Sequence, residues 1–162
     1  MGDREAFEGL VAALDYPMFI VTARAGGENL GCLIGFATQA SIHPARFLIG
    51  LSEKNRTFRV GRVAEYFAVH FVPDHRDDLA QHFGGQTGDE VDKFAGVEWE
   101  PGPGGTPLLS ELPNRFVGRV LERTSFGDHC GFLLEPVQAE HAADWEEFSF
   151  HRAKRIQPGH AP

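Results

Sequence analysis

The chain has 162 residues, 42% of them hydrophobic, and a formal net charge of −8. This length suits one domain over residues 1–162, with a core at about 10–156 and a frayed tail at 157–162. The negative net charge argues against a nucleic-acid or membrane-surface role. No apolar run approaches the roughly 20 residues of a membrane span. Without an apolar signal segment near residue 1, a cytoplasmic protein is expected.

Cysteine and histidine spacing gives no metal-binding pattern. Cys32 and Cys130 stand alone, without a Cys-x-x-Cys pair, which favours two buried free thiols. The eight histidines lack HExxH spacing, and the glycine pairs fit neither a GxGxxG nor a Walker motif. We therefore expect neither a metal site nor a Rossmann domain.

The hydrophobic pattern predicts mostly strands. A first helix is expected over residues 3–14, where Asp3 can cap the start and apolar side chains recur one turn apart. These side chains are Phe7, Leu10, Val11 and Leu14. The later elements expected in chain order are a strand at 18–24, a hairpin loop at 25–29, a strand-like run at 31–44, a strand at 47–51, a helix at 55–65, a strand at 66–72, helices at 74–83 and 88–94, an irregular loop at 100–107, and strands at 116–125, 130–140 and 148–156. Six or seven strands with few helices suggest a small, mainly β antiparallel barrel.

The run from Gly31 to Pro44 carries small and polar residues where a core strand typically carries bulky β-branched ones. A glycine inside a strand leaves room for close approach to the backbone, and Gly35 has this position. We therefore expect a flat ligand to lie along this strand.

The loop that follows the next strand opens a predicted helix. Ser52, Asn55 and Thr57 are ordinary helix-capping residue types, and capping alone would explain them. Lys54 and Arg56 favour a second interpretation, because cations are poorly placed at the positive end of a helix unless they hold an anion. A flat ligand with an acidic tail has the shape of FMN.

Asp128 and His129 follow Gly127 between two predicted strands. A turn alone would explain these residues. Alternatively, Asp128 orients His129 at a pocket mouth, where a histidine can bind a pyridine nucleotide or steady charge during hydride transfer. No Ser or Cys nucleophile motif accompanies them, which disfavours a hydrolytic triad.

In this order the features resemble the flavin reductase-like, FMN-binding split-barrel family, which includes the reductase components of two-component flavin monooxygenases. The resemblance covers most of residues 10–156. It rests on the segments Met18–Ala23, Gly31–Pro44, Asn55–Thr57, Tyr66–His70, Asp92–Phe94 and Gly127–His129. This chain departs from the family at Leu33, Ile34 and Gly35, where members usually carry Thr, Ala and Asn or Ser.

The resemblance implies a small antiparallel split β-barrel with a few peripheral helices. It also implies an NAD(P)H:flavin oxidoreductase that transfers hydride from NADH or NADPH to flavin N5. The implied assembly is a homodimer with FMN, or FAD, at the interface, and the implied partner is a flavin-dependent monooxygenase. The departures at 33–35 keep open a flavin-binding electron carrier or sensor without reductase turnover.

The residues and the resemblance together predict two groups of site residues. The catalytic group is His129 with Asp128. The flavin-binding group comprises Leu33, Ile34, Gly35, Phe36, Thr38, Ser52, Lys54, Asn55, Arg56, Thr57, Lys93 and Phe94.

Overall fold

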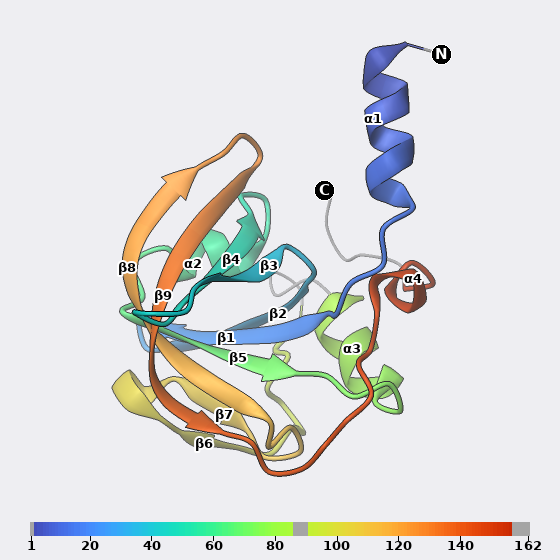
Figure 1. Cartoon of the computed structure of the whole chain (residues 1–162). Coiled ribbons are helices and arrows are strands. Elements are labelled where there is room, and N and C mark those ends of the chain that lie inside the picture. The colour runs from blue at the N-terminus through green and yellow to red at the C-terminus, as the bar shows by residue number, and fades with distance from the viewer. Residues whose placement is uncertain (1, 86–90, 157–162) are drawn as a thin grey trace.

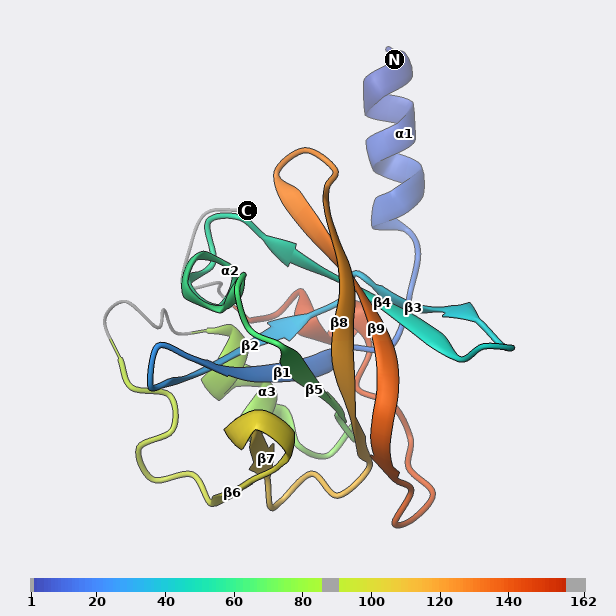
Figure 2. The ribbon, with the colours of Figure 1, turned by 90° about the vertical axis from the view of Figure 1, so that its left-hand side faces the viewer.

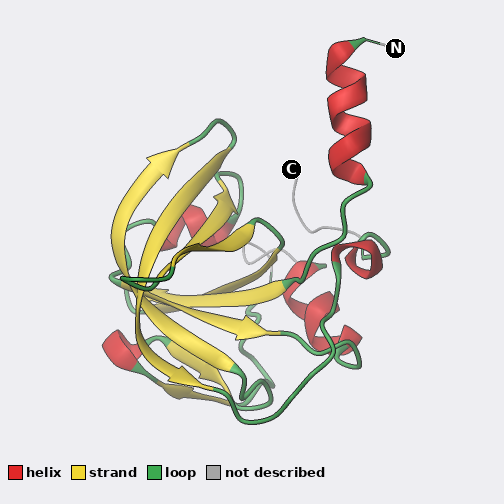
Figure 3. Ribbon diagram, viewed as in Figure 1, coloured by secondary structure: helices red, strands yellow, loops and turns green. Residues whose placement is uncertain are grey.

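The computed structural model describes residues 2–85 and 91–156. Strands make up most of its regular structure (Figure 3). Seven strands form one antiparallel sheet in the order β2-β1-β5-β8-β9-β4-β3, and β6 pairs with β7 in a separate sheet. The strands are β1 Phe19–Ala25, β2 Glu28–Ile34, β3 Ala37–Ser41, β4 Arg46–Ser52, β5 Tyr66–Phe71, β6 Trp99–Pro101, β7 Pro107–Leu109, β8 Arg115–Ser125 and β9 His129–Glu140.

The large sheet curls around one apolar core as an open barrel (Figure 1). Side chains from six of its strands meet there, and the phenylalanine rings pack edge to face, as Phe19 and Phe71 do at 5.0 Å between ring centres. The small antiparallel barrel expected from the strand pattern is therefore confirmed.

Strands β1 and β5 bury both of their faces, because alternate residues of a strand point to opposite sides. Val21 and Phe67 face the barrel interior, whereas Ile20 of β1 packs into a second apolar cluster outside the barrel and Ala68 of β5 packs into a third. That second cluster includes Phe83 of α3, and it fixes this helix against the outer face of the sheet.

The helices are peripheral (Figure 2). They are α1 Asp3–Ala12, α2 Arg56–Gly61, α3 Asp77–Gly84, the 3₁₀ turn η1 Pro103–Gly105 and α4 Phe150–Ala153. Helix α1 occurs where it was predicted, but it stands away from the barrel and buries none of its residues (Figure 1). The predicted Asp3 cap is wrong, because Gly2 is the N-cap and no side chain bonds there.

The run from 31 to 44 is two strands and not one. Strand β2 ends at Ile34 and pairs with β1, whereas β3 begins at Ala37 and pairs with β4. The chain bends at Gly35 and Phe36 and passes from one end of the sheet order to the other. The Phe36 carbonyl accepts the Gly50 N–H at 2.7 Å, which fixes this bend.

Other predicted elements differ from the structure in whole or in part. The strand predicted at 148–156 is wrong: Phe148 makes single backbone bonds to Met18 and Val72, and the chain then forms α4, where Phe150 stacks on Tyr16 at 4.6 Å. The helix predicted at 55–65 ends at Gly61. Of the helix predicted at 88–94, residues 88–90 lie outside the described residues, and 91–94 contain no helix.

A two-glycine turn sets the register of β1 and β2. Gly26 and Gly27 have φ of 59° and 75°, the left-handed conformation that two-residue hairpin turns require. Arg24 consequently lies directly opposite Asn29. The hairpin predicted at 25–29 is confirmed.

His70 is buried in β5 and is held by two backbone groups. Its Nε2 accepts the Leu109 N–H at 3.0 Å, so Nδ1 carries the proton and donates to the Ile20 carbonyl, also at 3.0 Å. Burial lowers the pKa of His70 from 6.5 to about 3. The side chain therefore links β5 to β1 and β7 in its neutral form.

This histidine should make folding stability depend on pH. Below pH 6.5 the unfolded chain binds a proton that folded His70 refuses until about pH 3, so stability falls as pH falls through this window. One proton corresponds to about 1.4 kcal/mol per pH unit. His70→Gln keeps a donor and an acceptor without titrating, so urea unfolding at several pH values should show a shallower slope. His75→Gln, at an exposed side chain, is the control, and equal slopes in both variants would contradict the assignment.

Candidate functional site

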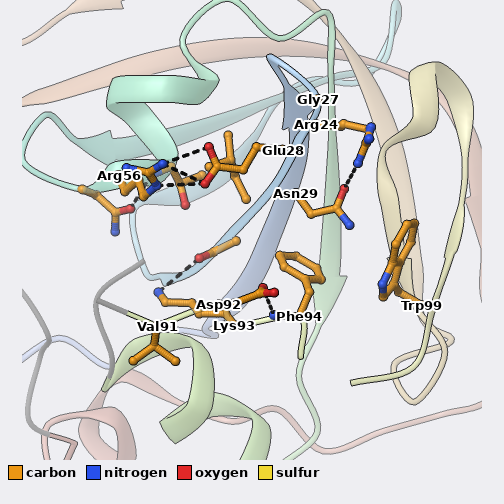
Figure 4. Close-up of a pocket in the computed structure, with 14 residues that line it drawn as sticks. Arg24, Gly27, Glu28, Asn29, Arg56, Val91, Asp92, Lys93, Phe94 and Trp99 are labelled. Carbon is orange, nitrogen blue, oxygen red and sulfur yellow. Dashed lines mark hydrogen bonds and ion pairs between the residues drawn. The ribbon is translucent and has the colours of Figure 1, made fainter. Parts of the chain in front are cut away.

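A cavity of about 590 Å³ lies beside β2, at the end of the sheet order (Figure 4). The β1–β2 hairpin forms one wall, the start of α2 forms a second, and residues 91–94 with Trp99 form the rest. The side chains labelled around it in Figure 4 include Arg24, Glu28, Asn29, Arg56, Asp92, Lys93, Phe94 and Trp99.

The start of α2 brings three predicted flavin-binding residues to this cavity. Asn55 caps the helix, since its Oδ1 accepts the Thr57 N–H at 2.8 Å, and the side chains of both residues are buried. Arg56 lines the cavity as well. Lys54 is exposed and is not among the lining residues.

Arg56 is paired with a carboxylate that sequence reasoning missed. Its Nε and Nη2 donate to both oxygens of Glu28 at 2.8 to 3.0 Å. A two-point arginine–carboxylate pair is among the stronger charged contacts in proteins. Glu28 therefore offsets the charge of Arg56 and ties α2 to β2.

Lys93 forms the floor of the cavity and is 6% exposed. Its Nζ donates to the Gly31 carbonyl at 3.2 Å and to the Phe83 carbonyl at 2.9 Å. In return, His82 Nε2 donates to the Lys93 carbonyl at 2.6 Å. Burial lowers the pKa of Lys93, and in the described part of the chain no carboxylate pairs with its ammonium group.

Gly31 allows the aromatic side chains below the cavity to reach the strand. A Cβ at this position would lie 2.9 Å from the Phe83 ring and 3.3 Å from the Phe94 ring. These two rings pack edge to face at 5.6 Å. The predicted residue Phe94 is thereby placed in the cavity wall.

The end of the cavity away from Arg56 is lined by Arg24, Asn29 and Trp99, which the sequence analysis did not single out (Figure 4). Arg24 Nη1 donates to Asn29 Oδ1 at 2.6 Å across the hairpin. Trp99 is 37% exposed and packs edge to face with Phe94, with 6.5 Å between ring centres. Arg24 and Asn29 lie on the β1–β2 hairpin, whereas Trp99 lies on β6, far away in the sequence. No local sequence motif therefore marks this end of the cavity.

The residues predicted on the flavin strand do not line this cavity. Leu33 contacts Gly84 of α3, and Ile34 is buried in the barrel core. Beside Gly35, the space that a side chain would take is filled by Tyr16 and Met18, at 2.6 and 2.8 Å from a Cβ built there. The opening expected at the Gly35 side-chain position is thus occupied by protein atoms, although its backbone remains a predicted contact.

Phe36 and His129 form a second group on another face, with ring centres 4.8 Å apart. Asp128 Oδ1 lies 2.8 Å from His129 Nδ1, and this hydrogen bond lowers the pKa of Asp128. Ser52 pairs with His129 across β4 and β9. Thr38 is exposed on β3. We call Phe36, Asp128 and His129 the His129 surface.

The described residues offer no metal site. Within residues 2–85 and 91–156, no group of three or more His, Cys, Asp or Glu side chains is arranged to hold an ion. Cys32 and Cys130 are free and buried. No helix in these ranges is both long and apolar enough to cross a membrane.

The structure is thus an antiparallel barrel with a polar cavity beside β2. Residues 11–157 match the family model described as "Flavin reductase like domain". The chain therefore belongs to this oxidoreductase family, as the order of its motifs predicted.

The chain is similar to the ferric-chelate reductase (NAD(P)H) of Archaeoglobus fulgidus, with 24% identity over 92% of this chain and 89% of the relative. It is also 23% identical to the 4-hydroxyphenylacetate 3-monooxygenase reductase component of Pseudomonas aeruginosa, over 92% and 91%. The solved NADH:FAD oxidoreductase SgcE6 of Streptomyces globisporus shares the fold, with a TM-score of 0.81, 22% identity and coverage of 99% and 92%. Several other relatives are longer, and this chain spans 66% of them or less.

Filling the space at Gly31 tests the packing under the cavity. Gly31→Ala should lower the free energy of unfolding by about 1–3 kcal/mol, because the rings of Phe83 and Phe94 must move. Gly9→Ala is the control, since nothing lies within 4 Å of a Cβ there. Urea unfolding measures both, and a Gly31→Ala variant as stable as the wild type would contradict the packing.

Proposed function

We propose that this chain is an NAD(P)H-dependent flavin reductase. The observation that carries the proposal is the basic cavity between the start of α2 and Lys93, in a chain of the flavin reductase like family. The similar chain from Archaeoglobus fulgidus, named for NAD(P)H, supports a nicotinamide donor.

The cavity residues fit a flavin phosphate. A volume of about 590 Å³ lies in the range of roughly 300–1,000 Å³ that small-molecule sites occupy. The Lys93 ammonium is buried, and it donates only to carbonyl oxygens in the described part of the chain. Because a buried cation is costly without a counter-charge, an anion in this cavity would stabilise it.

Each predicted group then has a role. Asn55, Arg56, Thr57 and Lys93 hold the phosphate, and residues 33–38 contact the ring system, as the resemblance implies. When bound, a flavin supplies the redox chemistry by accepting hydride at N5 and passing the electrons to an acceptor. The protein's contribution is to position the reactants and to exclude water.

His129 is proposed to bind the nicotinamide. The Asp128 carboxylate is an acceptor only, so His129 Nδ1 carries the proton and donates to it. Nε2 is then the ring nitrogen that remains available, and it has no hydrogen-bond partner among the described residues. Asp128 thereby orients His129 toward a ligand at the His129 surface.

We further propose a cytoplasmic homodimer with the flavin near its interface, working with a flavin-dependent monooxygenase. The named role of the similar Pseudomonas aeruginosa chain supports the monooxygenase partner. Exposed apolar side chains support the dimer. Phe7, Leu10 and Leu14 of the first helix and its end are 57% to 71% exposed, and Phe36 beside His129 is 57% exposed. Large apolar side chains exposed one turn apart along a helix are typical of an interaction site.

NAD(P)H oxidation with added FMN or FAD tests the reductase. We expect turnover by the wild type and a drop of about 10- to 100-fold in kcat/KM for NAD(P)H in His129→Ala, about 1.4–2.8 kcal/mol. Flavin affinity, measured by fluorescence quenching, should change little. His141→Ala is the control, because this exposed histidine also stands beside an aspartate, Asp144.

Two outcomes would count against this reading. Flavin binding without NAD(P)H oxidation would overturn the reductase and favour the electron carrier or sensor. Equal kinetics in the His129 and His141 variants would remove His129 from the site.

The dimer is tested by placing a charge on α1. Leu10→Glu should weaken self-association at least about tenfold, since burying a leucine contributes about 1.5–3 kcal/mol. Ala12→Glu introduces the same side chain on the opposite, polar side of the helix and should leave the dimer intact. Sedimentation equilibrium measures both, and a wild type that stays monomeric at micromolar concentration would refute the dimer.

A further inference from the structure

We infer that helix α1 of one copy lies over the His129 surface of a second copy, where its apolar side forms the outer wall of the site. This inference rests on the proposed homodimer and deepens it, because it names the segment that each copy supplies to the other.

Helix α1 is held away from its own barrel by polar contacts at its base. The Lys154 ammonium donates to the Ala12 carbonyl at 2.7 Å, and the His151 N–H donates to Asp15 Oδ1 at 2.9 Å. Both donors belong to α4 or to the residue that follows it. The segment after α1 is therefore fixed, and the helix projects from the molecule in a set direction (Figure 1).

A helix that projects in this way needs a partner for its apolar side. Helix α1 has 10 residues and buries none of them. Isolated helices shorter than about 12–15 residues are marginal in water, because packing of an amphipathic face supplies most helical stability in proteins. The apolar side chains that recur one turn apart on this helix and at its end are 40% to 71% exposed, namely Phe7, Leu10, Val11 and Leu14. The barrel of the same copy does not cover them.

The His129 surface lies beside a second exposed apolar group. Gly50 of β4 lies directly opposite Gly131 of β9, so neither strand has a side chain at this point. Phe36 covers Gly50 and Phe126 covers Gly131, and the two phenylalanines are 57% and 63% exposed. Phe36 also contacts the His129 ring, with 4.8 Å between ring centres. The two rings therefore form an apolar ledge next to His129 that is open to a partner.

The helix and the ledge together have the size that a dimer needs. An aromatic side chain can bury about 150–250 Å², so Phe7, Phe36 and Phe126, at 57% to 64% exposed, offer roughly 300–450 Å² per copy. This is up to about half of the roughly 800 Å² per partner that a stable interface buries. Leu10 and Leu14 add to it. Because a two-fold axis repeats each contact, every copy buries both its helix and its ledge.

Position and charge favour a second copy as the occupant. Helix α1 and the connection between β8 and β9 project at the same end of the molecule in both views (Figures 1 and 2). Two copies that meet through this end can place each α1 beside the β8–β9 connection of the other. Asp3 extends the apolar side of α1 by one turn. Lys54 is exposed and follows Glu53, whose N–H donates to the Asp128 carbonyl at 2.9 Å. Opposite charges thus flank the two apolar groups.

Disulfide cross-linking between two chains tests the contact. One chain carries Leu10→Cys and the other carries Phe126→Cys, so a bridge between these positions can form only across copies. The native Cys32 and Cys130 are buried and free. On mild oxidation the mixture should give at least about tenfold more covalent dimer than a mixture in which Ala12→Cys, on the opposite side of α1, replaces Leu10→Cys.

Further cysteine variants define what would overturn the contact. Phe7→Cys lies one turn away on the same side of α1 and allows for a shift of the helix along the ledge. Absence of bridging from both positions to Phe126→Cys overturns the inference. Bridging of the Leu10→Cys chain with itself would also overturn it, because α1 would then meet α1.

The activity of mixed dimers tests whether the contact completes the site. Leu10→Ala changes α1 and keeps His129, whereas His129→Ala does the reverse, and each should lose about tenfold or more in kcat/KM for NAD(P)H. In a mixed dimer, one site combines native His129 with a native α1 from the other chain. Random pairing of equal amounts makes about a quarter of all sites complete, so about a quarter of the wild-type activity should return.

The mixture decides between a shared site and a separate one. Activity no higher than the mean of the two variants, in a sample that sedimentation shows to be dimeric, overturns the inference, as does a fully active Leu10→Ala. Either result leaves the proposed reductase standing. A wild type without NAD(P)H oxidation would instead refute the reductase, while cross-linking, which needs no turnover, would still decide the contact.

Discussion

The ammonium group of Lys93 joins three parts of the molecule that the chain itself does not connect. It donates to a carbonyl of β2 and to a carbonyl at the end of α3, while the backbone of Lys93 accepts a bond from His82. The cavity has a floor because these bonds hold residues 91–94 against the sheet. A buried cation of this kind is unfavourable unless polar groups surround it, so the same group that completes the wall also attracts an anion.

Two polar contacts then set the shape of the cavity from the other side. The Arg56–Glu28 pair holds the start of α2 against the first residue of β2, and Asn55 caps that helix. These contacts place a helix start, a strand edge and a buried lysine around one space. The same loop reaches the His129 surface, because Ser52 is paired with His129. The proposed phosphate and nicotinamide groups are therefore linked through one short loop.

The sequence predicted the barrel because alternation and turn chemistry are local. Gly26 and Gly27 identify a hairpin between two predicted strands. The sequence-based prediction was wrong where a contact between distant parts of the chain determines the conformation. Residues 148–156 look like a strand, yet Phe150 stacks on Tyr16 and the chain becomes helical. Glu28, Arg24 and Trp99 carry no motif, and only folding brings them to residues predicted from the loop at 52–57.

The bend at Gly35 and Phe36 has a consequence for how the barrel forms. The two strands at the ends of the sheet, β2 and β3, follow each other directly in the chain. The entropy lost in bringing two segments together grows with the length of the loop between them. Here that loop is two residues long, as short as the turn between β1 and β2, so the two ends of the sheet are joined by a very short connection. The pairing of β4 with β9, in which Phe47 meets Leu134, joins segments much further apart in the chain and is left as the slower event in folding.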